Sequence, residues 1–237
     1  MPYALITGGN QGIGYAIACH LAQKGYDLIL VAKNKERLIK AKQALSGLYP
    51  AIKISIYRCN FAHTSSVEQL SDRILRQYSP IDILVNSAGV LTTHFIEADD
   101  NTIDHLLSIN LASTLILTNK VAQHMQQQQK GHIFTLASNT GINALPKIGL
   151  YGVTKAALIN YSESLFKHLL PYGVKVTCLC PSVVDTNMTN DGRIDNEAKI
   201  QPDDIVKAVD FALSLSPNAL LPQMTILCRP IELEKLK

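Results

Sequence analysis

Short runs of apolar residues recur along the chain and alternate with segments whose apolar residues follow helical spacing. Runs rich in β-branched and apolar residues are typical of strands that are buried on both faces. Because a helical pattern lies between successive runs, the order predicts parallel strands joined by crossover helices. The strands are expected at residues 3–7, 27–32, 52–57, 81–86, 131–138, 174–180 and 223–228.

The segments between the strands repeat apolar residues at i, i+3 and i+4, which places them on one face of a helix. No internal repeat, linker or second domain interrupts this order. We therefore expect an α/β fold with one domain over residues 1–237: a doubly wound parallel sheet of about seven strands with helices on both faces. The helices are expected at residues 12–24, 35–46, 65–78, 101–128, 150–170 and 203–215.

The composition narrows the classes of function. The 237 residues are 47% hydrophobic and 17% charged, enough to bury one sizeable core. The formal net charge of +3, without a block of basic residues, gives no electrostatic footprint for nucleic acid or an anionic membrane. No apolar run approaches ~18 residues and no leader peptide precedes the first strand, so we expect a cytoplasmic protein without a membrane partner.

The cysteines do not form the paired pattern of a zinc site. There are five, and the two nearest, Cys178 and Cys180, point to the same face of an expected strand. Small buried apolar side chains explain them better than a metal does, so no metal site is expected.

Tyr151 and Lys155 lie on one face of the helix expected at 150–170, because they are four residues apart. A positive charge beside a phenol lowers the pKa of the phenol from its ordinary value near ~10, and this would make the pair an acid/base device. A half-buried tyrosine beside a solvated lysine explains the same spacing. These two residues alone favour the second explanation.

The segment TGGNQGIG follows the first strand and leads into a helix. Gly8, Gly12 and Gly14 let the backbone approach a pyrophosphate, and the free N–H groups of a helix N-terminus attract it. The strict G-x-G-x-x-G spacing is absent, and a purely structural turn would also use glycine. In this strand-to-helix context, dinucleotide binding is the better explanation.

The end of the second strand bears on the choice of cofactor. An acidic residue there would hold the ribose hydroxyls of NAD, whereas a basic residue suits the 2′-phosphate of NADP. The strand ends at Ala32 and Lys33 follows, which favours NADP. Alternatively, Lys33, Lys35 and Arg37 are merely the solvated start of a helix. NAD stays open, because Glu36 could serve the ribose in a shifted register.

Residues just after the other strands are candidates for the same ligand crevice. The fourth strand ends in NSAG, residues 86–89, which is small enough for a cofactor to lie against it. Ser138 ends the fifth strand and could donate to a substrate oxygen, although a lone serine there is usually a turn residue or a cap. The loop CPSVVDTNM after the sixth strand borders the same crevice.

Together these motifs resemble the short-chain dehydrogenase/reductase family in order and along essentially the whole chain. TGGNQGIG corresponds to T-G-x-x-x-G-x-G, NSAG to N-N-A-G, and PSVVDT to P-G-x-x-x-T. Asn110, Ser138 and the pair Tyr151-x-x-x-Lys155 complete the set. Each motif is weak, but the combination reverses the initial preference and favours catalysis by Tyr151 and Lys155. The resemblance implies a Rossmann-like fold.

The resemblance also implies hydride transfer between a nicotinamide and a carbonyl or alcohol. Tyr151 would act as general acid or base, and Lys155 would lower its pKa and hold the nicotinamide ribose. Ser138 would hydrogen-bond the substrate oxygen. Asn110 would fix a water that links Lys155 to solvent, or else would be a satisfied amide within a helix.

The expected cofactor is NADP(H), held by the glycine-rich loop, the strand ends and a loop in which Val184 and Thr186 would hold the carboxamide. The full expected set is Gly8, Asn10, Gln11, Gly12, Ile13, Lys33, Asn60, Phe61, Asn86, Ala88, Gly89, Tyr151, Lys155, Pro181, Val184 and Thr186.

Three positions depart from the family pattern. Ser87 replaces the second Asn of N-N-A-G and Ser182 replaces the Gly after Pro181, and both substitutions are small enough to be tolerated. Asn60 stands where the family often has an Asp against the adenine, and its amide can still pair with the adenine edge.

Substrate specificity is expected at the mouth of the crevice, beneath a small lid between Val183 and Ile200. Its wall combines apolar residues with few charges, which favours a neutral carbonyl compound of modest size. The expected substrate residues are Ser138, Leu91, Asn139, Ile142, Leu145, Val183 and Met188.

The leading hypothesis is an NADP-dependent oxidoreductase that acts on a small carbonyl or alcohol. One alternative is a 3-oxoacyl thioester reductase of the same family, although no clear basic patch for an acidic carrier is present. Another is a non-catalytic NADP-binding sensor or scaffold, against which the intact Ser138, Tyr151 and Lys155 argue. The resemblance suggests a homodimer or homotetramer packed through the helices at 101–128 and 150–170.

Overall fold

The computed structural model describes residues 1–236, so the last residue of the predicted 1–237 domain lies outside the described residues. Seven strands form one sheet in the order β3-β2-β1-β4-β5-β6-β7, and all neighbouring strands are parallel. The predicted doubly wound parallel sheet is confirmed. The strands are β1 (Tyr3–Thr7), β2 (Asp27–Ala32), β3 (Ile54–Arg58), β4 (Ile81–Asn86), β5 (Gly131–Leu136), β6 (Val174–Pro181) and β7 (Gln223–Ile226).

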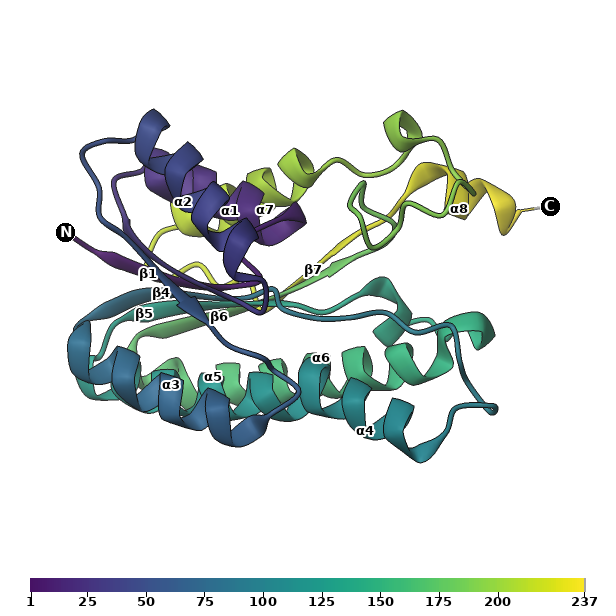
Figure 1. Ribbon diagram of the computed structural model, residues 1–237, viewed down its shortest axis with the longest axis horizontal. Helices are drawn as coiled ribbons and strands as arrows, with labels where there is room; N and C mark the ends of the chain where they lie inside the picture. The colour runs from purple at the N-terminus through teal and green to yellow at the C-terminus, as the bar shows by residue number, and fades with distance from the viewer. Residues whose placement is uncertain (237) are drawn as a thin grey trace.

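Helices cover both faces of this sheet (Figure 1). The helices in residues 1–236 are α1 (Gly12–Gln23), α2 (Lys35–Leu48), α3 (Thr64–Gln77), α4 (Asp100–Leu107), α5 (Ser113–Gln128), α6 (Gly149–Leu169), α7 (Pro202–Ser214) and α8 (Arg229–Glu234). Helices α1, α2 and α7 lie on one face, and α3, α4, α5 and α6 lie on the other. The sheet is therefore the middle of three layers.

Alternate residues of each strand enter opposite cores. In β1, Ala4 and Ile6 pack with the helices α1, α2 and α7, whereas Leu5 packs with α3 and α5, and all three side chains are 0% exposed. Successive side chains of a strand point to opposite faces, so a strand covered on both sides needs an unbroken apolar run. This explains why such runs predicted the strands.

The bounds of the predicted elements differ from the observed ones by at most two residues, with one exception. The single helix predicted at 101–128 is interrupted by a π-helical segment, Ser108–Ala112, between α4 and α5. Helix α8 was not predicted, because its six residues are too few to show a helical period.

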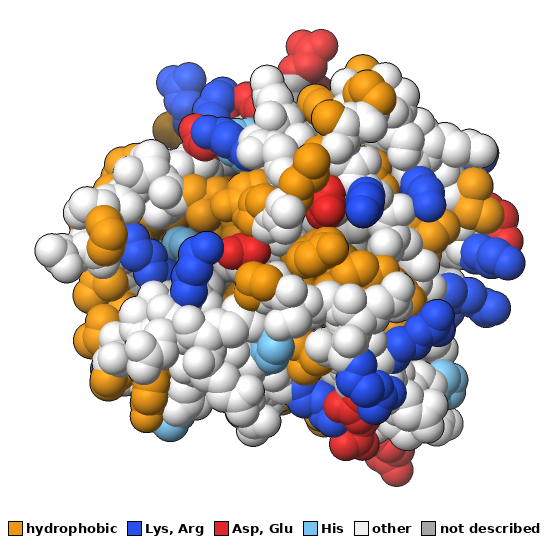
Figure 2. Space-filling view, turned by 90° about the vertical axis from the view of Figure 1, so that its left-hand side faces the viewer, with side chains coloured by type: hydrophobic (Ala, Val, Ile, Leu, Met, Phe, Trp, Pro, Cys, Tyr) orange, Lys and Arg blue, Asp and Glu red, His pale blue; other side chains and the backbone are white. Residues whose placement is uncertain are grey.

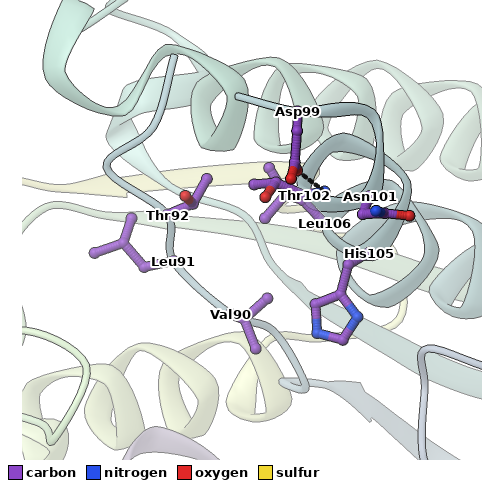
Figure 3. A pocket seen from close by; sticks show the side chains of 8 residues that line it. All are labelled: Val90, Leu91, Thr92, Asp99, Asn101, Thr102, His105 and Leu106. Atoms are coloured by element: carbon purple, nitrogen blue, oxygen red, sulfur yellow. Dashed lines mark hydrogen bonds between the residues drawn. The ribbon is translucent and has the colours of Figure 1, made fainter. Parts of the chain in front are cut away.

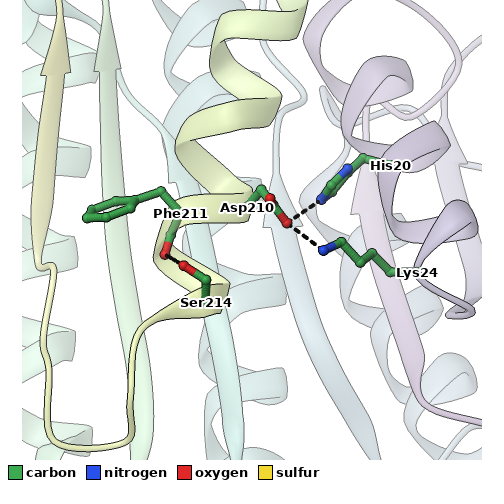
Figure 4. A network of polar contacts seen from close by, with 5 residues as sticks. All are labelled: His20, Lys24, Asp210, Phe211 and Ser214. Atoms are coloured by element: carbon green, nitrogen blue, oxygen red, sulfur yellow. Dashed lines mark hydrogen bonds and ion pairs between the residues drawn. The ribbon is translucent and has the colours of Figure 1, made fainter.

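Polar contacts join helices on the same face of the sheet. Asp210 of α7 lies between His20 of α1 and Lys24, which caps the end of α1, with His20 Nε2 at 3.0 Å and Lys24 Nζ at 2.8 Å from Asp210 Oδ1 (Figure 4). Hydrogen bonding to Lys24 is the largest cause that lowers the pKa of the Asp210 carboxyl. This contact fixes α7, and with it the end of the preceding loop, against α1.

The surface on the side where the chain begins mixes positive, negative and apolar side chains (Figure 2). At the amino ends of β4 and β5, Lys130 Nζ lies 2.9 Å from Asp82 Oδ1, and the Asp82 side chain is only 8% exposed. Asp82 also accepts a hydrogen bond from the backbone N–H of Tyr3. Within residues 1–236, none of the helices combines the length and apolar character that crossing a bilayer requires.

His132 is a buried imidazole in the middle of the sheet. Its ring stacks on Phe134 with centroids 4.0 Å apart, and its Nε2 lies 2.9 Å from Thr177 Oγ1. Because the Thr177 hydroxyl donates its proton to Leu221 O, His132 Nε2 must be the donor to Thr177. Burial, followed by the charge of Lys175, lowers the pKa of His132 to about 3.

We predict that His132 makes the protein less stable as the pH falls. An unfolded histidine takes up its proton near ~6.5, whereas the folded one resists to about 3. The free energy of unfolding should therefore decrease by up to ~1.4 kcal/mol per pH unit through this window because of His132 alone. Urea unfolding of wild type and His132→Leu between pH 6.5 and 4 measures this, and equal slopes for the two proteins would contradict it.

Candidate active site

A cavity of about 570 Å³ lies at the carboxyl ends of β1, β2, β3 and β4. Its lining contains eight of the residues predicted to bind the cofactor: Gly8, Asn10, Gln11, Lys33, Asn60, Phe61, Ala88 and Gly89. The sequence motifs at four separate strand ends therefore meet in one place.

The glycine-rich loop at one side of this cavity is closely packed against itself. A Cβ placed on Gly14 would lie 2.5 Å from Gly8 O, and Gly8 has a φ of +67°. Helix α1 begins at Gly12 without a side-chain cap, so N–H groups of its first turn are free for an anion. The loop forms a cradle of the kind that suits a pyrophosphate.

Thr7, which sequence analysis missed, connects this loop to the NSAG segment. Its hydroxyl oxygen accepts hydrogen bonds from the backbone N–H groups of Ser87 and Ala88, at 3.0 and 3.1 Å. Asn86 was expected to bind the cofactor, but its buried amide donates to Thr118 and Thr135 instead. It lies outside the lining of the cavity, because those two contacts hold it within the layer of α5 and β5.

Several cations surround the outer end of the cavity. Lys33, Lys35, Arg37 and Arg58 line it together with a single anion, Glu36. The Arg37 guanidinium donates to Gln11 Oε1, so it reaches across to the glycine-rich loop. Sequence analysis chose Lys33 for the 2′-phosphate and kept the solvated start of a helix as the alternative for Lys33, Lys35 and Arg37.

Arg58 is a cavity residue that sequence analysis missed. Arg58 is the last residue of β3. The sequence pattern predicted that this strand ends at Tyr57, so Arg58 could have been found as the residue that directly follows a predicted strand. Nearby, Asn60 Oδ1 accepts a hydrogen bond from Ala62 N at 3.3 Å, and the Phe61 side chain packs into the core.

Tyr151 and Lys155 are both buried in α6, at 9% and 5% exposure. Lys155 Nζ lies 5.4 Å from the centroid of the Tyr151 ring and donates to Leu136 O at 2.7 Å. It also lies beside the NSAG segment, because a Cβ placed on Gly89 would be 3.8 Å from Lys155 Nζ. The ammonium group is therefore close to both the tyrosine ring and a residue that lines the cavity.

The pKa of Tyr151 moves in the direction opposite to that predicted from the sequence. Burial raises it to about 12, and hydrogen bonding with Ser138 lowers it only in part. Burial also lowers the pKa of Lys155 to about 8. The predicted lowering by Lys155 is not found: desolvation dominates, and Lys155 is not among the groups that shift the pKa of Tyr151.

Ser138 is held in place by its neighbours. Its Oγ accepts hydrogen bonds from Thr140 N and Thr140 Oγ1, at 3.2 and 3.0 Å, and donates to Pro181 O at 3.4 Å. Ser138 lies two residues beyond the end of β5 and caps a short 3₁₀ turn at 139–141. Thr140, which sequence analysis did not consider, fixes the direction of the Ser138 hydroxyl.

Asn110 lies fully buried in the π-helical segment at 108–112. Its amide accepts from Val90 N and donates to Val90 O, both at 2.8 Å, and donates to Thr154 Oγ1 at 3.3 Å. The amide thus ties the loop after β4 to α6, next to Lys155. This bridging explains the irregular helix, since π segments often bring a side chain into a functional site.

The remaining predicted cofactor residues lie in α1, at the end of β6 and on the loop that follows β6. Ile13 and Val184 pack against the core around α1 and α7, and Pro181 is buried at the end of β6. A Cβ placed on Gly12 would lie 3.3 Å from Thr186 Cγ2. The structure therefore brings the loop after β6 into contact with the glycine-rich loop.

The predicted substrate residues divide into two groups. Leu91, Ile142, Leu145 and Met188 are exposed, between 37% and 46%. Asn139 is only 5% exposed and accepts from Asn143 Nδ2, so it is a buried structural residue and does not belong to an open wall. Val183 is half-buried and packs against the core.

A second cavity of about 530 Å³ adjoins the first and shares Val90 and His105 with it (Figure 3). It lies between the loop after β4 and the start of α4, where Asp99 accepts from Thr102 N at 2.7 Å. Leu91 lines this second cavity. Sequence analysis did not predict the cavity itself.

Comparison with known proteins places the chain in a family. Residues 2–197 match the family described as short chain dehydrogenase. The chain belongs to this family. The predicted resemblance is thereby confirmed, and the chain is an oxidoreductase of the short-chain dehydrogenase type.

Two relatives of this short-chain dehydrogenase come from staphylococci. An uncharacterized oxidoreductase of Staphylococcus saprophyticus is 32% identical over 230 residues, which cover 96% of this chain and 97% of that protein. An uncharacterized oxidoreductase of Staphylococcus epidermidis is 33% identical over 229 residues, which cover 96% of each.

Solved structures share the fold of this short-chain dehydrogenase over nearly its whole length. A β-ketoacyl-[ACP] reductase from Bacteroides thetaiotaomicron is 29% identical with a TM-score of 0.85, and 98% of each chain is covered. An alcohol dehydrogenase from Thermococcus sibiricus, complexed with 5-hydroxy-NADP, is 25% identical with a TM-score of 0.86, covering 95% of this chain and 96% of that one. A short-chain dehydrogenase from Sphingobium yanoikuyae, in complex with NADPH, is 25% identical with a TM-score of 0.84, covering 100% and 92%.

We predict that Gly14→Ala destabilises this short-chain dehydrogenase and weakens dinucleotide binding at least ~10-fold. The new Cβ would lie 2.5 Å from the backbone oxygen of Gly8, so the loop must move. The expected loss of folding free energy is ~1–3 kcal/mol, as for other overpacked sites. Thermal unfolding and calorimetric titration with NADPH measure the two effects.

Gly47→Ala is the matched control. Gly47 also lies in a helix, α2, but a Cβ there meets no atom within 4 Å. This change should leave dinucleotide binding unaltered and raise stability by up to ~1 kcal/mol. If Gly14→Ala behaved like Gly47→Ala, the close approach of the loop to Gly8 would be irrelevant to binding.

Proposed function

We propose that this chain catalyses the NADP-dependent interconversion of a small carbonyl compound and its alcohol. The observation that carries this proposal is a chain of neighbours: Tyr151 lies beside Ser138 and Lys155, and Lys155 lies beside Gly89, which lines the glycine-rich cavity. Side chains that can hold a substrate oxygen and move a proton are thus linked through Lys155 to this cavity. The whole chain, built on one sheet, would act as a single domain.

The lining of the cavity supports binding of the adenosine and pyrophosphate half of a dinucleotide. Its volume of about 570 Å³ lies in the usual range of ligand sites, and the Gly8 and Gly14 backbones leave no room for side chains. The first turn of α1 would bind the pyrophosphate, while Val184 and Thr186 would hold the carboxamide. A bound nicotinamide would supply or accept the hydride.

The protonation states favour Tyr151 as proton donor in the direction of reduction. With a pKa raised to about 12, the phenol keeps its proton at neutral pH and can give it to a carbonyl oxygen. Ser138, whose Oγ accepts a hydrogen bond from Thr140 Oγ1, would turn its proton from Pro181 O to the same oxygen and stabilise its negative charge. Lys155, whose pKa is lowered to about 8, remains mostly charged at neutral pH and would hold the nicotinamide ribose.

A preference for NADP is supported by the cations at the outer end of the cavity. Lys33, Arg37 and Arg58 all line it, and a 2′-phosphate is the group that such a cluster would attract. Glu36 is the only anion in the lining. Two similar solved structures are described with NADPH or a 5-hydroxy-NADP.

We predict that NADPH binds at least ~10-fold more tightly than NADH and that Lys33→Ala or Arg58→Ala removes most of this ~1.4 kcal/mol difference. Each substitution removes a positive charge from the lining without touching the glycine-rich loop. Calorimetric dissociation constants for both dinucleotides, measured at one salt concentration, provide the test.

The control for this comparison is Lys40→Ala, which removes an exposed cation of α2 outside the cavity. It should leave the ratio of the two constants unchanged. Equal binding of NADH and NADPH by the wild type would show that the cofactor preference is wrong, and substrates would then be sought among alcohols oxidised with NAD.

We predict that Tyr151→Phe lowers carbonyl reduction at least ~100-fold, because the proton donor is lost. NADPH oxidation with a panel of aldehydes and ketones measures the rate, and NADPH affinity should change less than ~3-fold. Tyr161→Phe, in the same helix and bonded to Asn119, serves as the control with wild-type rates. Undiminished turnover by Tyr151→Phe would disprove the assigned role.

A 3-oxoacyl thioester is a second candidate substrate. The similar β-ketoacyl-[ACP] reductase structure, at 29% identity and a TM-score of 0.85, favours including it. If the ratio kcat/KM for a 3-oxoacyl thioester exceeds that for every simple carbonyl, this second activity is the correct one. Tight NADPH binding without turnover on any compound would instead favour a non-catalytic sensor.

A further inference from the structure

Lys199 is a buried lysine in the loop between β6 and α7. It is 5% exposed, and its Nζ donates to Thr189 O at 2.8 Å and to Asn196 Oδ1 at 2.9 Å. Among residues 1–236 it forms no ion pair with a carboxylate. A buried ammonium is costly unless hydrogen bonds hold it, so these two contacts are what keep it in place.

The contacts of Lys199 lead to the residues that face the glycine-rich loop. The Thr189 hydroxyl donates to Val184 O, and Thr189 N donates to Thr186 O at 3.0 Å. Lys199 in turn binds the carbonyl of Thr189. A continuous path of hydrogen bonds therefore connects the buried ammonium to Val184 and Thr186.

The two ends of this loop are joined where Lys199 lies. Asp185 N donates to Ile200 O at 2.8 Å, and Ile200 N donates to Val183 O at 3.1 Å. Residues 185–199 thus form a loop whose two ends are held together by backbone hydrogen bonds. Thr189 hydrogen-bonds to Val184, just before the start of this loop, and Lys199, at the end of the loop, hydrogen-bonds to Thr189.

We propose that Lys199 is a positioning residue: it latches residues 184–189 against the glycine-rich loop and thereby sets the affinity for the nicotinamide half of the cofactor. The inference rests on the proposed function, in which Val184 and Thr186 hold the carboxamide. Without the latch, Thr186 is free to leave its place beside Gly12, where a Cβ would meet it at 3.3 Å. The adenosine half binds elsewhere, among Lys33, Arg37 and Arg58, and does not depend on the latch.

The test compares two ligands on Lys199→Met, which keeps an aliphatic stem of similar length but donates no hydrogen bond. NADPH contains the nicotinamide, and 2′-phospho-ADP-ribose lacks it. We expect the affinity for NADPH to fall at least ~10-fold and that for the fragment to change less than ~2-fold, in line with the loss of charged hydrogen bonds. Calorimetric titration of the full chain measures both.

A second readout needs no ligand. Subtilisin cleavage within residues 185–199, located by mass spectrometry, should be at least ~10-fold faster in Lys199→Met than in wild type, because the loop opens more often. Asn196→Ala removes one of the two acceptors at an exposed position and should give an intermediate rate if Lys199→Met fails to fold. Lys207→Met removes an exposed lysine of α7 and should match the wild type.

Two outcomes overturn the latch: equal loss of affinity for NADPH and the fragment, or an unchanged cleavage rate in both loop variants. The proposed function fails separately. If the wild type binds NADH and not NADPH, the same comparison is made with NADH and ADP-ribose. If it binds neither dinucleotide, the cleavage rate alone decides whether Lys199 holds the loop.

Discussion

The candidate site depends on one buried amide. Asn110 binds both the N–H and the carbonyl of Val90 and also contacts Thr154, the residue before Lys155. A loop that lines two cavities is thereby held to the helix that carries Tyr151 and Lys155. Without this bridge, the backbone of Val90 would lose both of its partners in a region that is partly shielded from water, which is costly.

Burial determines the chemistry of the polar groups at this site more than their mutual attraction does. Tyr151 and Lys155 lie close enough to interact, yet their pKa values move toward the neutral forms of both groups. This is the behaviour of two ionisable groups in a poorly solvated environment. A charge that develops on a substrate at this site would be stabilised by fixed dipoles, such as the hydroxyl of Ser138, and not by water.

The sequence was informative where a function depends on local spacing. Sequence analysis could find the glycines at 8, 12 and 14 because their geometry follows from a tight turn. It could find Tyr151 and Lys155 because their geometry follows from the helix. Thr7, Thr140 and Lys199 could not be found in this way. Each acts through a contact with a loop whose path depends on tertiary packing, and the broken helix around Asn110 has the same origin. The direction of the Tyr151 pKa also required burial, which spacing does not reveal.

The order of the strands has a consequence for how the chain is assembled. Strands β3, β2, β1 and β4 are neighbours in the sheet and all lie within the first 86 residues. A chain that grows from its N-terminus can therefore complete these pairings before β5, α6 and β6 are synthesised. The half-sheet that carries the glycine cradle comes first, with the edge of β4 exposed until β5 arrives to cover it. The residues suited to proton transfer are synthesised later and pack against this half of the sheet.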